Sequence, residues 1–155
     1  MTASFVEEFI GGGLELSVMV ACTANGNCVA YDPVEMVVDP KLRMLDYLLA
    51  PARIDQATAN AARHLAVKTV ESFGSPGLFG VELFCTLDGD LLINEVAPRA
   101  HNSGHHTIEA SVTSQFENQL RVCLNLPLGD TSLHSKALTV NLVGEPGFYG
   151  KPVIE

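Results

Sequence analysis

Two apolar runs flank the dipeptide Asp88-Gly89, and this stretch constrains the fold more than any other part of the chain. Residues 78–87 and 90–97 are both rich in apolar and β-branched side chains. An Asp-Gly pair between two such runs is the strongest short-range signal for a β-hairpin. We therefore predict two antiparallel strands joined by a two-residue turn.

The predicted turn sets the register of this hairpin, because side chains alternate between the two faces of a strand. Leu87 then faces Asp90, and counting back places Glu82 directly opposite Glu95. Like charges about 4.5–5.5 Å apart destabilise a sheet unless a cation lies between them. Mg²⁺ prefers oxygen ligands and usually arrives with substrate phosphates. The pair predicts a metal site, and the alternative is an exposed acidic pair on a solvated face.

The rest of the chain predicts an α+β fold with a mostly antiparallel sheet packed with two main helices. Asp55 is the expected N-cap of the first helix and Gly74 its C-cap. The predicted strands cover 4–10, 14–24, 28–37, 45–50 and 138–143, and the helices cover 56–73 and 111–124. The buried stripes are expected to be Ala62, Leu65, Ala66, Thr69, Val70 and Phe73 in the first helix, and Phe116, Leu120, Cys123 and Leu124 in the second.

Composition narrows the class of protein. The 155 residues suit one domain, and a formal net charge of −9 argues against nucleic acid or an anionic membrane as a partner. No apolar run reaches the ~18 residues of a membrane span, and no signal peptide is recognised. The four cysteines lack metal-site spacing, so we expect reduced, buried thiols in a cytoplasmic protein.

The loop that leaves the second strand is dense in functional side chains. Arg99, His101, Asn102 and Ser103 follow Glu95 closely, so they are expected to lie near the predicted metal. A guanidinium beside a phosphate site can hold an oxyanion through paired hydrogen bonds. The alternative is that Arg99 only pairs with a carboxylate and that the histidines are surface residues.

Two other interpretations of this chain are weaker. A zinc site at His101, His105 and His106 lacks suitable spacing and a cysteine or histidine partner. A phosphate loop at Gly11-Gly12-Gly13 lacks the lysine and the helix that such loops require, so a simple turn is favoured.

Several motifs together resemble N5-carboxyaminoimidazole ribonucleotide synthetase, a family of ATP-grasp ligases of purine synthesis. The similar stretches are Phe79-Gly-Val-Glu-Leu-Phe, Asn94-Glu-Val-Ala-Pro-Arg-Ala-His-Asn-Ser-Gly-His-His, Thr113-Ser-Gln-Phe-Glu-Asn-Gln-Leu-Arg and Leu126-Pro-Leu-Gly. The Pro-Arg-Ala-His-Asn-Ser-Gly-His run is the most specific of them. Family members often carry a histidine after the second strand of the first hairpin, whereas Val38 stands at the nearest position here.

The resemblance implies a reaction of aminoimidazole ribonucleotide with bicarbonate and Mg-ATP through carboxyphosphate, in an enzyme expected to be a homodimer. It implies that Glu82 and Glu95 bind Mg²⁺. Residues implied to contact ATP are Glu7, Glu8, Phe9, Ile10, Glu15, Asn94 and Glu95, and those implied near bicarbonate and the ribonucleotide are Arg99, His101 and Asn102.

The resemblance further implies that residues 1–155 are the carboxy-terminal lobe of an ATP-grasp domain, expected to be inactive alone. Two alternatives stay open at this point. One is a non-catalytic module that binds Mg-nucleotide, and the other is a different carboxylating or formylating ATP-grasp ligase.

Overall fold

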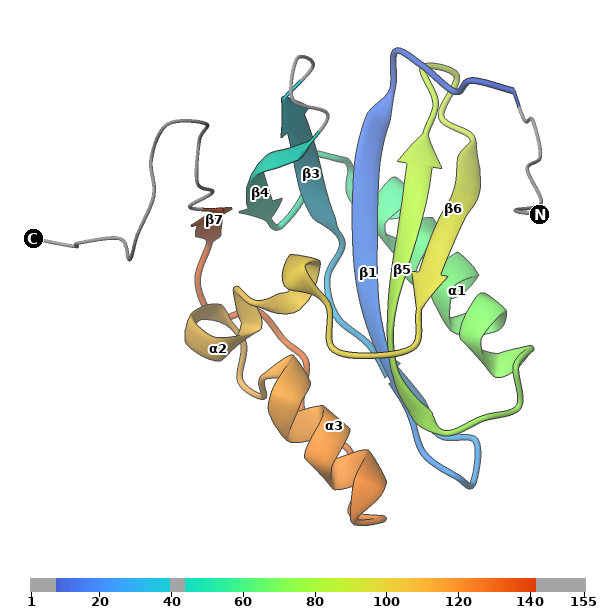
Figure 1. Cartoon of the computed structure of the whole chain (residues 1–155), viewed down its shortest axis with the longest axis vertical. Helices are drawn as coiled ribbons and strands as arrows, with labels where there is room; N and C mark the ends of the chain where they lie inside the picture. Colours follow the sequence, from blue (N-terminus) through green and yellow to red (C-terminus); the bar gives the residue numbers. More distant parts are fainter. Residues whose placement is uncertain (1–7, 40–43, 142–155) are drawn as a thin grey trace, which may run out of the picture.

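The computed structural model describes residues 8–39 and 44–141, which form one antiparallel sheet with helices on both faces (Figure 1). The order of the strands is β6-β5-β1-β3-β4-β7, and β2 pairs with one end of β1. The α+β architecture is confirmed. The elements are β1 (Leu14–Cys22), β2 (Cys28–Ala30), β3 (Val34–Asp39), β4 (Met44–Ala50), α1 (Gln56–Glu71), β5 (Gly77–Cys85), β6 (Leu91–Ala97), the 3-10 turn η1 (Asn102–Gly104), α2 (Thr107–Ala110), α3 (Gln115–Cys123) and β7 (Ala137–Val140).

Strand β1 lies in the middle of the sheet, and its side chains divide the molecule into two layers. Leu16, Val18 and Val20 point to one face, where they pack against α1. Met19 and Ala21 point to the opposite face, toward α3 and the segment that precedes it. This alternation is the period of two that a strand imposes.

Helix α1 begins where the sequence predicts. The carboxylate of Asp55 accepts hydrogen bonds from the backbone N–H groups of Ala57 and Thr58, at 2.8 and 3.0 Å. The helix buries Ala62, Ala66 and Val70 against the sheet. Phe73 was expected in this stripe, but it follows the end of the helix at Glu71 and is 52% exposed.

Helix α3 is shorter than predicted and faces the other way. It begins at Gln115, because the hydroxyl of Ser114 caps the N–H of Glu117. Its buried side chains are the polar Gln115 and Asn118, which make hydrogen bonds inside the protein, so the predicted inward apolar face is wrong. The outward residues are Phe116, Leu120, Cys123 and Leu124.

The turn between β5 and β6 contains three residues rather than two. The N–H of Thr86 donates to the carbonyl of Asp90 at 2.9 Å, and the N–H of Gly89 donates to the carbonyl of Thr86 at 3.0 Å. Gly89 has a φ of 87°, which a glycine adopts readily at the end of such a loop. Thr86 therefore faces Asp90, and the predicted pairing of Leu87 with Asp90 is wrong.

A β-bulge in β6 reverses this one-residue shift. Leu83 pairs with Ile93 but Glu82 pairs with Glu95, which leaves Asn94 as the extra residue. Bulges of this kind re-aim side chains and often lie beside functional sites. The predicted pairing of Glu82 with Glu95 is confirmed, because the offset of the loop and the offset of the bulge cancel.

Three further predictions need correction or fall outside the described residues. The return strand predicted over 28–37 is interrupted at residues 31–33 and divides into β2 and β3. Residues 8–10 form no strand, and residues 4–7, 40–43 and 142–155 lie outside the described part. The turn η1 lies within residues 98–107, which were expected to form a polar loop, and the side chain of His101 caps it by accepting from the N–H of Ser103. Helix α2 was not predicted.

The prediction of four reduced and buried thiols is wrong for three cysteines. Cys22 and Cys28 are partners across β1 and β2 and form a disulfide. The hairpin at Asn25-Gly26 brings them together, a consequence that their spacing alone did not reveal. Cys123 is exposed, whereas Cys85 is free and buried as expected. Within the described ranges, no helix is both long and apolar enough to cross a bilayer.

Candidate active site

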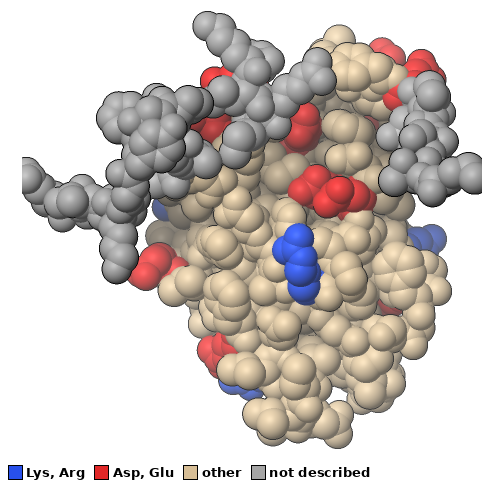
Figure 2. Space-filling model, viewed as in Figure 1, with Lys and Arg blue, Asp and Glu red and all other residues tan. Residues whose placement is uncertain are grey.

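Glu82 and Glu95 lie side by side on the face of the sheet that is opposite α1. One carboxylate oxygen of each lies within 4.8 Å of the other and of a ring nitrogen of His101. Glu15 and Ser17 of β1 share this face. Ser17 pairs with Glu82, and Glu15 pairs with Phe84, which lies two residues further along β5 and therefore on the same face. On the surface shown in Figure 2, acidic side chains gather close to a patch of basic atoms.

The pKa of Glu82 is raised by its surroundings. Burial, followed by the charges of Glu95 and Glu15, raises the pKa of Glu82, and the Asn94 amide partly opposes this shift. Burial also raises the pKa of Glu15. A set of carboxylate oxygens that repel one another without a cation suits a hard divalent ion such as Mg²⁺. The bulge places Asn94 on the same side, where its Nδ2 lies 3.5 Å from Glu82 Oε2.

The loop after β6 returns over this face and presents His101 to the acidic pair. Nε2 of His101 is 3.5 Å from Oε1 of Glu82. Burial and the nearby charge of Arg99 lower the pKa of His101, so its ring is neutral at neutral pH. Gly80 of β5 leaves room for the ring, since a Cβ there would lie 2.8 Å from Cβ of His101.

The other residues of the predicted cluster take different positions. Arg99 is exposed, and its Nη1 donates to the carbonyl of Ala100 at 3.0 Å. No carboxylate among the described residues forms an ion pair with it, so the interpretation of a simple structural pair is not supported. Nδ2 of Asn102 donates to Oδ1 of Asn141 at 3.2 Å, which holds this loop against the end of the last strand.

The neighbouring histidines do not join the site. The ring of His106 is buried, and its Nδ1 contacts the carbonyl of Ser103 at 3.0 Å. Burial lowers the pKa of His106. His105 is exposed, with its ring centroid 5.9 Å from that of Phe116. Only His101 of the three therefore faces the carboxylates.

Two hollows meet at Glu15. The first, of about 270 Å³, includes Glu82, His101 and Asn102 and has apolar walls from Met36, Val38 and Leu45. The apolar walls were not predicted; one of them is Val38, the position nearest to the histidine that the resemblance led us to expect. Alternation along β1 could have indicated Ser17, the polar residue that follows Glu15 on this face.

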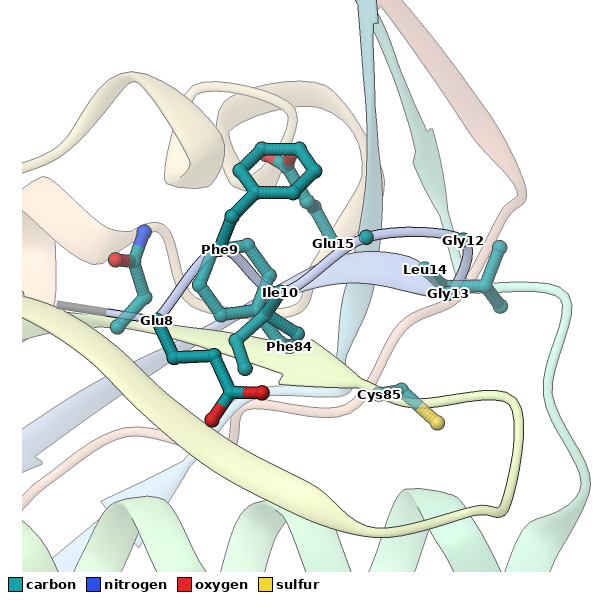
Figure 3. A pocket seen from close by; sticks show the side chains of 11 residues that line it. Glu8, Phe9, Ile10, Gly12, Gly13, Leu14, Glu15, Phe84 and Cys85 are labelled. Carbon is teal, nitrogen blue, oxygen red and sulfur yellow. The ribbon is translucent and has the colours of Figure 1, made fainter.

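The second hollow, of about 410 Å³, is bounded by the segment that leads into β1 (Figure 3). Glu8, Phe9 and Ile10 contribute to its wall, as do Glu15 and Asn94. Phe9 is 90% exposed, so this segment presents an apolar ring to solvent. Glu7, which was predicted to belong to the same group, lies outside the described residues.

The glycine run beside this hollow, Gly11-Gly12-Gly13, forms a turn. This is the interpretation that the sequence favoured over a phosphate loop. A Cβ at Gly13 would lie 2.0 Å from the carbonyl oxygen of Cys85, so the backbone of this turn touches β5 itself. Gly12 has a φ of 83°, which favours glycine.

Comparison with known proteins identifies the family. Residues 1–116 match the ATP-grasp domain. The chain is an ATP-grasp protein. Its fold is therefore that of the ATP-grasp family, as the resemblance of its motifs indicated.

Relatives of this ATP-grasp chain are named as a synthase, a synthetase and a carboxylase. The N5-carboxyaminoimidazole ribonucleotide synthase of Bacillus subtilis is 39% identical over 140 residues, which cover 90% of this chain and 36% of that protein. The phosphoribosylaminoimidazole carboxylase of Schizosaccharomyces pombe is 39% identical, over 95% of this chain and 28% of that protein. The N5-carboxyaminoimidazole ribonucleotide synthetase structure from Thermotoga maritima is 49% identical with a TM-score of 0.85, over 94% of this chain and 38% of that one. The chain thus spans about a third of the length of these relatives.

Proposed function

We propose that this chain is the carboxy-terminal lobe of the ATP-grasp domain of a ligase that carboxylates 5-aminoimidazole ribonucleotide. The co-substrates are bicarbonate and Mg-ATP, and the product is N5-carboxyaminoimidazole ribonucleotide. The observation that carries the proposal is the meeting of two hollows at Glu15, one beside Glu82 and Glu95 and the other beside an apolar segment. An N5-carboxyaminoimidazole synthase structure from Aspergillus clavatus, in complex with ADP and 5-aminoimidazole ribonucleotide, is 36% identical to this chain with a TM-score of 0.80.

The nucleotide would occupy the second hollow and extend toward the first. Backbone groups of Glu7, Glu8, Phe9 and Ile10 would contact adenine, and Glu15 would accept hydrogen bonds from the ribose hydroxyls. Glu15 suits this role because it lines both hollows. Asn94 and Glu95 would then close the phosphate end of the nucleotide.

Glu82 and Glu95 would hold Mg²⁺ through their carboxylate oxygens, the ligand type that this ion prefers. When bound, the ion would neutralise charge on the transferring phosphoryl group. The like-charge repulsion within the pair supports this assignment, because a cation relieves it. Asn94 supports the orientation of Glu82 from the bulge.

Arg99, His101 and Asn102 would act on bicarbonate, carboxyphosphate and the ribonucleotide. A free guanidinium can bind a carboxylate or phosphate with two parallel hydrogen bonds. A neutral imidazole and an amide can donate to the same anions. Oriented donors of this kind stabilise negative charge that develops during phosphoryl and carboxyl transfer.

We also propose that the whole protein is a cytoplasmic homodimer. An exposed apolar stripe on α2, α3 and the residues between them supports a protein contact in this region. Its members are Ile108, Val112, Phe116, Leu120 and Leu124, each at least 37% exposed.

The experiment is a phosphate-release assay on the full-length protein. We expect bicarbonate-dependent release that increases when 5-aminoimidazole ribonucleotide is added, and that Glu95→Gln abolishes. Phosphate release that depends on bicarbonate but does not increase with the ribonucleotide would indicate a different carboxylating ligase. Nucleotide binding without any release would indicate a non-catalytic module. Asp46→Asn, an exposed acidic position on β4, serves as the matched control.

A further inference from the structure

A chain of hydrogen bonds reaches His101 from inside the sheet. Oγ of Ser17 lies 2.7 Å from Oγ of Ser103, and Oγ of Ser103 lies 2.8 Å from Nδ1 of His101. Ser17 is 1% exposed and Ser103 is 0% exposed. Buried hydroxyl groups are costly unless their hydrogen bonds are made, so this chain is a specific feature of the core.

We propose that Ser103, supported by Ser17, is a positioning residue that holds His101 as the tautomer with its proton on Nε2. The first reason is the backbone. The N–H of Ser103 points to Nδ1 of His101 at 3.4 Å, and an N–H group can only donate. Nδ1 must therefore offer its lone pair, which leaves the ring proton on Nε2.

The direction of the hydroxyl chain gives a second and independent reason. With Nδ1 as acceptor, Ser103 donates to His101 and Ser17 donates to Ser103, so each hydroxyl hydrogen has an acceptor. With a proton on Nδ1 instead, Ser103 would have to accept from both His101 and Ser17 and donate only to Sδ of Met19 at 3.8 Å, and a thioether sulfur is a much weaker acceptor than an imidazole nitrogen.

The backbone of His101 is held as firmly as its ring. Its N–H donates to Oε1 of Gln115 at 3.0 Å, and its carbonyl accepts from Nε2 of Gln115 at 2.8 Å. Gln115 is fully buried. With the absent Cβ of Gly80 providing space, the ring has one orientation, in which Nε2 faces Glu82.

This orientation assigns a chemical role to the site. With a proton on Nε2, the neutral ring presents a donor toward the hollow and lacks the lone pair that a metal ligand or a general base would need there. His101 thus donates a hydrogen bond to an anionic oxygen beside the carboxylate pair, whereas the metal stays with Glu82 and Glu95. This role rests on the proposed function, but the tautomer itself does not.

The tautomer can be measured on this chain by long-range ¹H–¹⁵N NMR of ¹⁵N-histidine, with His101 assigned from the spectrum of His101→Gln. We expect the pattern of a neutral ring with a protonated Nε2 and a hydrogen-bonded Nδ1. A protonated Nδ1, or an equal mixture of both forms, would overturn the proposal. Ser103→Ala should move the Nδ1 resonance toward that of a free acceptor, and an unmoved resonance would also overturn it. Ser72→Ala, an exposed serine after α1, is the control.

A double variant covers the case in which Ser103→Ala does not fold. Ser17→Ala with Ser103→Ala removes both hydroxyls, so neither serine is left with an unpaired hydroxyl, and Nδ1 of His101 loses its hydroxyl donor as in the single variant. In the full-length enzyme we expect either Ser103 variant to lower kcat ~10–100-fold while KM for Mg-ATP changes less than about twofold, because a misplaced donor mainly affects the transition state. Ser103→Thr, which keeps the hydroxyl, should restore part of kcat. If 5-aminoimidazole ribonucleotide does not increase phosphate release by the wild-type ligase, the proposed function fails while the NMR result stands.

Discussion

Glu82 and Glu95 are direct cross-strand partners, on the face of the sheet that also carries Glu15. Nothing cationic among the described residues pairs with either carboxylate except the imidazole of His101, whose pKa is lowered. The pair is therefore a source of repulsion in the isolated chain. Substitution of Glu82 separates this repulsion from the metal binding that we propose for the pair.

Glu82→Gln should stabilise the chain in the absence of divalent ions. The folded state raises the pKa of Glu82 above 4.5, so it binds more protons than the unfolded state as pH rises through that value. Stability consequently falls with increasing pH across this window, and the loss persists at neutral pH. Chemical denaturation at pH 7.5 should give a free energy of unfolding about 0.5–1 kcal/mol higher for the variant.

The advantage of Glu82→Gln should vanish at pH 4, where the wild-type carboxyl is already protonated. Asp46→Asn supplies a control for the loss of one exposed negative charge. A gain in stability that is the same at both pH values would show that repulsion between the carboxylates is not its origin.

Gly80→Ala should destabilise the chain through His101. The added Cβ would lie 2.8 Å from Cβ and 2.9 Å from Cγ of His101, so the loop must move. Overpacking of this kind costs about 1–3 kcal/mol. His101→Ala removes only one of these two contacts, so combining it with Gly80→Ala should recover part of the loss. Thermal and chemical unfolding of the four proteins in this double-mutant cycle measures the coupling, and strictly additive effects would contradict the contact.

Asn118→Ala should destabilise the layer between α3 and the sheet. Nδ2 of Asn118 donates to Oη of Tyr31 at 2.7 Å, and its Oδ1 accepts from the N–H of Gly129 at 2.8 Å. Removing this amide takes the acceptor from the part-buried N–H of Gly129 and the donor from the buried hydroxyl of Tyr31, and losses of this kind cost about 1–3 kcal/mol. Asn60→Ala makes the same substitution on the exposed side of α1 and should cost far less. Equal losses from the two variants would show that the buried amide contributes nothing specific.

Local chemistry predicted the parts of this fold that depend on neighbouring residues. Asp55 was identified as an N-cap because capping needs only the next three residues. The pairing of Glu82 with Glu95 was also predicted from the sequence. It is correct only because the longer loop shifts the register by one residue and the bulge in β6 shifts it back. A loop of three residues and a bulge at Asn94 both depend on how the strands twist and pack, which alternation of side chains does not reveal.

The orientation of α3 shows what sequence periodicity misses. Its apolar stripe predicts an inward face, yet Gln115 and Asn118 are buried because partners far away in the chain satisfy their amides. Those partners, His101 and Tyr31, are brought close only by the tertiary fold. The same holds for Ser17 and Ser103, which are 86 residues apart.

The most direct test of the carboxylate pair is paramagnetic NMR with Mn²⁺, which shares the preference of Mg²⁺ for carboxylate oxygens. Substoichiometric Mn²⁺ with ADP should first broaden the amide signals of residues 80–84 and 93–97, together with His101. Residues 120–126 at the far end of α3 should keep their signals. Glu82→Gln with Glu95→Gln should weaken this binding at least about tenfold, which corresponds to about 1.4 kcal/mol. Broadening centred elsewhere, or equally strong in the double variant, would contradict the account.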